Sequence, residues 1–193
     1  MSNAPHLLER ARVGFRMGEV RLADSMIKDG LWDPYGDKHM GLCAEACARR
    51  FEFTREMQDA YARGSYERAR AAVECGLFEQ EIVAVEVSQG KGASKTVLRD
   101  EEPFKSPLEK MATLKPAFAP DGTITAANAS KINDGAAALV IARKGQTTTD
   151  PIAQIAAYAG FAQEPEWFTT APAKAALKAL DRAGLSPKDI GAW

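Results

Sequence analysis

The chain reads Asn128-Ala-Ser-Lys-Ile-Asn-Asp-Gly-Ala-Ala-Ala138 directly before the apolar run Leu139-Val-Ile-Ala142. Small residues in such a place let a ligand or a second backbone approach closely. The side chains of Asn128, Ser130 and Asn133 can each donate and accept hydrogen bonds. A crowded polar turn that leads into a buried strand favours a binding site. The alternative is a tight turn whose polar side chains only cap the backbone.

That run resembles the Asn-Ala-Ser-x-x-Asn-Asp-Gly-Ala-Ala-Ala signature of the thiolases, the acetyl-CoA acetyltransferase and 3-ketoacyl-CoA thiolase family. Further stretches resemble the family in the family's own order: Ser2-Asn-Ala-Pro5, Lys38-His-Met-Gly41 with Ala44-Glu45, Gln58-Asp-Ala-Tyr61 with Ser65-Tyr66, Leu114-Lys-Pro-Ala-Phe118 and Trp167-Phe-Thr-Thr-Ala-Pro172. Several matches in a fixed order are far more specific than any one of them, and they cover almost the whole chain.

The resemblance implies an α/β fold, specifically a fragment of the thiolase fold. A thiolase consists of two similar α/β halves with a loop domain inserted in the first. On this mapping, residues 1–127 are the loop domain, 128–145 finish the first half, and 150–193 open the second half.

The resemblance also implies what these residues do not contain. Thiolases carry a nucleophilic Cys before the first matching stretch, and Asn-Glu-Ala-Phe, Gly-His-Pro and Cys-Gly-Gly-Gly motifs after the last one. None of these motifs occurs in the 193 residues. We therefore expect the chain alone to be inactive. It is a piece of an ordinary thiolase, one half of a split enzyme, or a non-catalytic CoA-binding or oligomerisation module.

His39 and Met40 are the first candidate site residues. A helix start disfavours the charged imidazolium, so a neutral ring beside a flexible apolar side chain suits a thioester ligand. Spacing alone favours the alternative of a surface-capping His and a core Met. The resemblance implies that His39 lies close to the bound acyl-CoA and that Met40 lines the acyl pocket.

Ser130 is the next candidate, because the matching Ser in the family hydrogen-bonds the pantetheine arm of CoA. Ala126 makes room for that arm. The resemblance also assigns four positions to the CoA or acyl contacts, although core packing is the ordinary role of such side chains: Leu31, Tyr66, Phe118 and Phe168. The tyrosine matching Tyr66 helps bind potassium in some thiolases, which leaves the metal open.

The chain departs from the family pattern in the run Asp100-Glu-Glu-Pro-Phe-Lys-Ser106. Some thiolases have an Arg there that meets the nucleotide end of CoA. Lys105 is the candidate replacement for a phosphate contact, and Lys110 stands where some relatives have a Ser. The nucleotide contacts are therefore left open by the sequence.

Composition indicates an ordinary globular protein, with 46% hydrophobic and 26% charged residues and a net charge of −1. This charge gives no reason to expect a nucleic-acid partner. The sequence has no run of about 18 apolar residues, so no membrane-spanning helix is expected. Cys43, Cys47 and Cys75 form an odd set that suits a reducing, cytoplasmic compartment. We expect them to act as small apolar residues. The expected partners are acyl-CoA or acetyl-CoA as substrate, with no permanent cofactor, and further copies of the chain in a dimer or tetramer.

Periodicity predicts the main elements. Helices are expected at 37–50, from the N-cap Thr54 to Gly76, and at 173–183 before Gly184. A short helix is expected at 23–28. Strands are expected at 82–87, at 136–142 in a buried position, and at 152–162. Residues 88–107 are expected to form an exposed loop segment, and residues 144–150 a polar linker.

Overall fold

The computed structural model describes residues 1–90, 92–105, 107–146 and 149–193. The chain forms two compact units: Met1–Cys47 with Lys131–Trp193, and Ala48–Ser130. Helices alternate with three two-stranded antiparallel sheets among the described residues, so the fold is α/β. The three-part division into 1–127, 128–145 and 150–193 rests on resemblance and stays a prediction, and the predicted linker includes residues 147 and 148, which lie outside the described residues.

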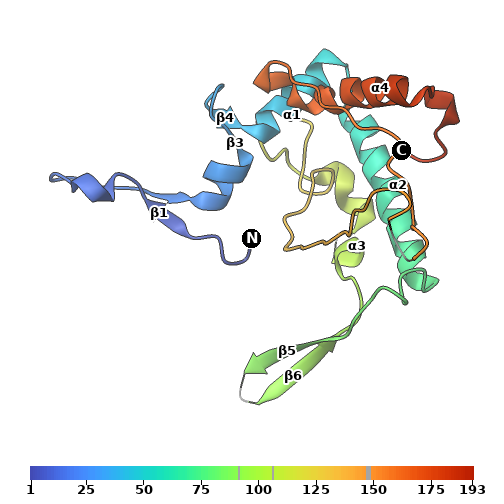
Figure 1. Ribbon diagram of the computed structural model, residues 1–193. Coiled ribbons are helices and arrows are strands. Elements are labelled where there is room, and N and C mark those ends of the chain that lie inside the picture. The colour runs from blue at the N-terminus through green and yellow to red at the C-terminus, as the bar shows by residue number, and fades with distance from the viewer. Residues whose placement is uncertain (91, 106, 147–148) are drawn as a thin grey trace. The chain divides into compact units, whose positions relative to one another are not determined.

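The first unit opens with two small hairpins (Figure 1). Strand β1 (His6–Leu8) pairs with β2 (Leu22–Asp24), and the connecting loop holds the short 3-10 helix η1 (Ala11–Val13). A π-helical turn, η2 (Ile27–Leu31), then leads into β3 (Trp32–Asp33), which pairs with β4 (Lys38–His39). The predicted helix 23–28 is therefore displaced, because the π-helical turn runs through Gly30 rather than stopping before it.

Helix α1 (Met40–Arg50) begins three residues later than the predicted start at Asp37. Asp37 adopts a left-handed φ of 48° instead of capping the helix, and this closes the β3–β4 turn. Its Oδ1 accepts a hydrogen bond from Trp32 Nε1 at 3.1 Å. Gly36 fits in this turn because a Cβ there would lie 2.6 Å from Asp33 Oδ2.

The second part of the first unit contains η4 (Pro165–Thr170), α4 (Ala171–Ala183) and η5 (Pro187–Asp189). The helix predicted at 173–183 is confirmed. It begins two residues earlier, at Ala171. Pro172 is tolerated in the first turn because the N–H that proline lacks would have no helical acceptor there. Gly184 ends it with a left-handed φ of 68°.

The strands predicted at 136–142 and 152–162 are wrong, since neither segment has regular secondary structure. Leu139, Val140 and Ile141 are 88%, 100% and 75% exposed, and Ile152 is fully exposed. A strand forms only beside a neighbour whose backbone groups pair with it. In the described part of the chain, each strand pairs only with the other strand of its own hairpin, and none pairs with these apolar segments.

The second unit is organised by the long helix α2 (Arg55–Glu74). Its predicted cap is confirmed, because Thr54 Oγ1 accepts a hydrogen bond from Met57 N at 3.2 Å. Gly76 follows the helix with a φ of 73°. Two short helices contact α2, namely α3 (Glu102–Lys105) and η3 (Leu108–Thr113).

The core of this second unit is small. Leu108, Met111 and Ala127 are buried, and Ala62 and Tyr66 from α2 pack against them. The predicted exposed segment 88–107 includes part of a β-hairpin. In it, β5 (Val85–Gly90) pairs with β6 (Ala93–Val97), and the hairpin projects from the unit (Figure 1). β5 starts later than predicted because Ile82 N still donates to Phe78 O in the preceding turn.

Candidate functional site

His39 and Met40 lie at the junction of β4 and α1, and both are half-buried. The backbone N–H of Gly41 donates a hydrogen bond to His39 Nδ1 at 2.9 Å. The His39 side chain thus accepts from the backbone at the first turn of α1, which fixes the orientation of its ring. Leu31, also half-buried, ends the π-helical turn just before β3. The hairpin therefore brings three of the predicted site residues into one short stretch of backbone.

An ion pair joins this hairpin to η4, where Phe168 is located. Lys38 Nζ lies 2.6 Å from Glu166 Oε1. The hydrogen bond to Glu166 raises the pKa of Lys38 from its ordinary value, and partial burial opposes this rise. Phe168 is 40% exposed. The pair thus links the segment with His39 to the segment with Phe168 across 128 positions of sequence.

Two buried side chains belong to the hairpin and the helix that follows it: Asp33 on β3 and Cys43 on α1. Asp33 is 6% exposed, and its Oδ1 accepts a hydrogen bond from Tyr35 N at 3.0 Å. Its Oδ2 is buried and has no hydrogen-bond partner in the part of the chain that the structure describes. Cys43 is fully buried, and burial raises the pKa of its thiol although Lys38 acts in the opposite direction. A buried neutral thiol is a poor nucleophile, which supports the interpretation of Cys43 as a packing residue.

In the second unit, residues 123–130, which include the first three residues of the signature stretch, form a compact turn built around Asn128. Asn128 Oδ1 accepts a hydrogen bond from Thr125 N at 2.7 Å, and its Nδ2 donates to Thr123 O at 3.1 Å. Ala129 N donates to Thr125 O at 2.9 Å. Thr125 and Ala127 are buried beneath this turn, at 0% and 3% exposure. Ala126 and Ser130 are exposed on either side of Asn128.

The turn is anchored to α2 by Asp59. Asp59 Oδ1 accepts a hydrogen bond from Asn128 Nδ2 at 2.9 Å, and Asp59 Oδ2 accepts one from Arg55 Nε at 2.7 Å. Arg55 also donates to the backbone carbonyls of Met111 and Leu114, at 2.6 and 3.1 Å. Sequence reasoning missed the roles of Asp59 and Glu166, although Asp59 stands in the Gln58-Asp-Ala-Tyr61 stretch and Lys38 in the His39 motif.

The remaining predicted residues of this unit divide between the turn and the core. Phe118 is half-buried next to Ala117, whose N–H donates to Ile124 O at 2.8 Å and so joins that segment to the start of the turn. Tyr66 packs against the buried cluster of Leu108 and Met111. The structure therefore groups Leu31, His39, Met40 and Phe168 in one unit, and Tyr66, Phe118, Ala126 and Ser130 in the other.

Three positively charged side chains in or near the predicted nucleotide-contact region already contact other side chains of this chain. Lys105 Nζ lies 3.2 Å from Glu102 Oε2, and the run that contains it ends at residue 106, outside the described residues. Arg99 places its guanidinium 4.0 Å from the centre of the Phe104 ring, and Arg70 covers the same ring at 5.7 Å. Lys110 is exposed on η3.

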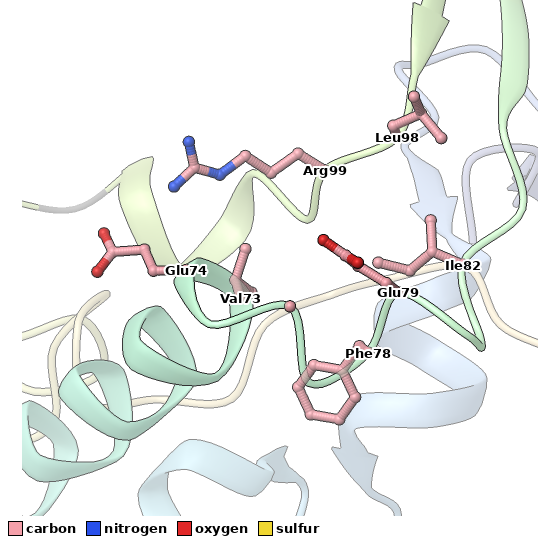
Figure 2. Close-up of a pocket in the computed structure, with 8 residues that line it drawn as sticks. Val73, Glu74, Phe78, Glu79, Ile82, Leu98 and Arg99 are labelled. Carbon is pink, nitrogen blue, oxygen red and sulfur yellow. The ribbon is translucent and has the colours of Figure 1, made fainter.

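A cavity of about 400 Å³ lies beyond the end of α2. Figure 2 shows the residues that line it. The Glu79 carboxylate extends into it between Arg99 and Ile82 (Figure 2). None of the predicted site residues lines this cavity. A second hollow of about 390 Å³ runs beside Arg55, Asp59 and Met111. The described residues include no group of three or more His, Cys, Asp or Glu side chains that could hold a metal ion, and none of their helices has the length and apolar character that a membrane span requires.

Comparison with known proteins gives the family. Residues 1–145 match the family described as "Thiolase, N-terminal domain". The chain therefore belongs to the thiolase family, and its α/β fold is a fragment of the thiolase fold. The solved structure of an acetyl-CoA acetyltransferase from Syntrophomonas wolfei superimposes with a TM-score of 0.86 at 36% identity, covering 100% of this chain and 49% of that one.

The similar proteins carry an enzyme name. Acetyl-CoA acetyltransferase 2 of Arabidopsis thaliana is 50% identical over 195 residues, which cover 98% of this chain and 48% of the relative. The relative named "Acetyl-CoA acetyltransferase ERG10, cytosolic" from Gibberella zeae is 45% identical over 98% of this chain and 49% of its own length. The chain thus spans about half the length of the curated relatives it matches.

Proposed function

We propose that this chain is the CoA-binding part of an acetyl-CoA acetyltransferase, which transfers acyl groups between CoA thioesters. The observation that carries the proposal is the anchored turn of Asn128, which exposes Ala126 and Ser130 at the point where the stretch matching the thiolase signature begins. The enzyme names of the relatives support the reaction, and the cytosolic relative supports a cytoplasmic location. A role in fatty acid metabolism belongs to the same proposal.

Each candidate residue has a binding role in this proposal. The Ser130 hydroxyl bonds the pantetheine arm, and Ala126 leaves space for it. Neutral His39 lies by the thioester, while Met40, Leu31 and Phe168 form the apolar surface for the acyl group. Phe118 and Tyr66 support the CoA side.

The resemblance implies that two Cys residues and one His supply the chemistry in a thiolase, and none of their motifs occurs in these 193 residues. In thiolysis, a Cys thiolate attacks the 3-keto carbon, and the bond between C2 and C3 breaks. Acetyl-CoA leaves after its carbanion takes a proton from the second Cys. The CoA thiol then gives its proton to the thiolate of the second Cys and attacks the carbonyl of the acyl-enzyme, and the first Cys leaves as a thiolate. Claisen condensation is the reverse sequence. The 193-residue chain alone is expected to show no turnover.

The binding proposal is tested by titrating CoA into the purified chain by calorimetry. Wild type should bind, and Ser130→Ala should weaken binding about fivefold, the value of one hydrogen bond. Ser94→Ala, an exposed Ser on β6, is the matched control and should leave the affinity unchanged. The absence of CoA binding by wild type, or equal affinities for wild type and Ser130→Ala, would contradict the proposal.

A role in assembly is the second candidate, and the loop between β1 and β2 favours it. This loop exposes large apolar side chains, with Val13 at 84% and Met17 at 105%. Such side chains on one projecting loop suit contacts with further copies of the chain. We propose a dimer or tetramer built partly through this loop. Met17→Lys should lower the mass measured by light scattering, and an unchanged mass would exclude the loop from the interface.

A further inference from the structure

We propose that Asp59 is a positioning residue, which acts through Asn128 to hold the turn that presents Ala126 and Ser130. What the turn binds rests on the proposed function, but the positioning itself stands on the hydrogen bonds of Asp59 and Asn128. Asp59 and Asn128 are 69 positions apart in the sequence and belong to the same compact unit.

The Asp59 carboxylate is itself held in a fixed orientation. It belongs to the second turn of α2, and Arg55 pairs with it at i,i+4 spacing. The side chains of Arg55 and Asp59 are only 19% and 13% exposed. Because Arg55 is also bonded to two carbonyls of the η3 segment, it cannot turn away from Asp59 without breaking those bonds. The carboxylate is therefore a rigid acceptor on a long helix.

Both the oxygen and the nitrogen of the Asn128 side-chain amide make hydrogen bonds. Its Oδ1 accepts the backbone N–H of Thr125, while its Nδ2 donates to Asp59 Oδ1 and to the carbonyl of Thr123. The amide cannot be flipped, because its NH₂ would then face the Thr125 N–H and its oxygen would face the carboxylate. Asp59 thus fixes the rotamer of Asn128, and Asn128 fixes the backbone of the turn.

A neighbouring bond strengthens the arrangement. Gln58 Nε2 donates to Thr123 Oγ1 at 2.8 Å, so successive residues of α2 contact the start of the turn and its centre. The consequence for function is geometric. A hydroxyl that must meet one amide of an extended ligand has to be held to within a fraction of an ångström, and an exposed turn reaches that precision only with external support.

A reciprocal exchange of the two side chains tests this assignment in the full 193-residue chain. Asn128→Asp places a second carboxylate against Asp59, so the contact becomes repulsive. Adding Asp59→Asn to that variant restores one amide and one carboxylate in reversed order, and the oxygen of the new amide can still accept from Arg55. Glu67→Gln, which removes an exposed charge from the same helix, is the matched control.

Two readouts are compared among these variants: amide hydrogen exchange of residues 123–130 and the dissociation constant for CoA. Asn128→Asp should speed exchange and weaken CoA binding, each by about tenfold, since a partly buried charge loses its donor. The double variant should recover part of both losses. Recovery stays incomplete because a carboxylate at position 128 cannot donate to the carbonyl of Thr123. Helical circular dichroism should stay constant throughout.

The outcomes separate the two claims. Unchanged exchange in Asn128→Asp, or a double variant no better than Asn128→Asp, would overturn the positioning role. If Asn128→Asp only lowered the general stability of the chain, adding Asp59→Asn would not restore slow hydrogen exchange. If exchange follows the expected pattern but wild type binds no CoA, the positioning of the turn stands and the proposed function fails.

Discussion

The Nζ atom of Lys38 lies 2.6 Å from the Oε1 atom of Glu166, and this ion pair connects the β3–β4 hairpin to η4. The residue after Lys38 is His39, and Phe168 lies two positions beyond Glu166. Two segments assigned to the acyl pocket are therefore held together by one contact that neither assigned residue makes itself.

Breaking this pair should loosen η4 more than it affects overall stability. Glu166→Gln removes the charge that Lys38 faces, and partly exposed ion pairs contribute little to global stability. Hydrogen exchange of residues 165–170 should increase about threefold or more while the melting temperature hardly changes. The reversed pair Lys38→Glu with Glu166→Lys should restore slow exchange. Equal exchange in wild type and Glu166→Gln would show that the contact does not hold η4.

Alkaline pH should destabilise the protein through Cys43. Burial raises the pKa of its thiol in the folded state above the ordinary value of 9.0. The folded state therefore holds this proton more tightly than the unfolded state does. The contribution is fully present below the unfolded pKa and is lost as pH rises through the folded pKa. Lys38, whose folded pKa is also raised, acts in the same direction at still higher pH.

Urea unfolding at several pH values from about 8 to 11 checks this expectation, since that window spans the ordinary Cys pKa. The free energy of unfolding of wild type should fall more steeply with pH than that of Cys43→Ala, which lacks the thiol. Parallel curves for the two proteins would show that Cys43 does not titrate differently on folding.

Met111 should be the most sensitive core position of the second unit. Its side chain is 1% exposed and belongs to the cluster with Leu108 and Ala127. Met111→Ala should lower the free energy of unfolding by about 2–4 kcal/mol, because it removes buried apolar atoms and leaves a cavity. Met57→Ala changes the same residue type at a position of α2 that is 53% exposed and should cost less than about 1 kcal/mol. A similar effect of both substitutions would argue against this core.

The apolar segment Leu139–Val140–Ile141 should make the purified chain self-associate. These side chains are exposed and are not paired in any sheet of the described residues. Replacing Leu139 and Val140 by Lys should reduce the mass measured by light scattering at high protein concentration. Gln154→Lys adds charge at an exposed polar position without removing an apolar side chain. A monomeric wild type with one sharp thermal transition would contradict this expectation.

Local sequence signals predicted the helices well and the strands poorly. Thr54 and Gly184 bound their helices as capping chemistry requires. The run 136–142 has strand composition, yet a strand also needs a partner that composition does not reveal. The contacts of Asp59 with Asn128 and of Lys38 with Glu166 join distant positions, so no local pattern could predict them.

The most direct test of the proposed function is to map where CoA contacts the 193-residue chain, by comparing amide hydrogen exchange with and without saturating CoA. CoA bound at the proposed site should slow exchange in residues 126–130 and around His39 and Met40. Protection confined to the cavity of Figure 2, around Phe78, Ile82 and Arg99, or no protection in any segment, would contradict it.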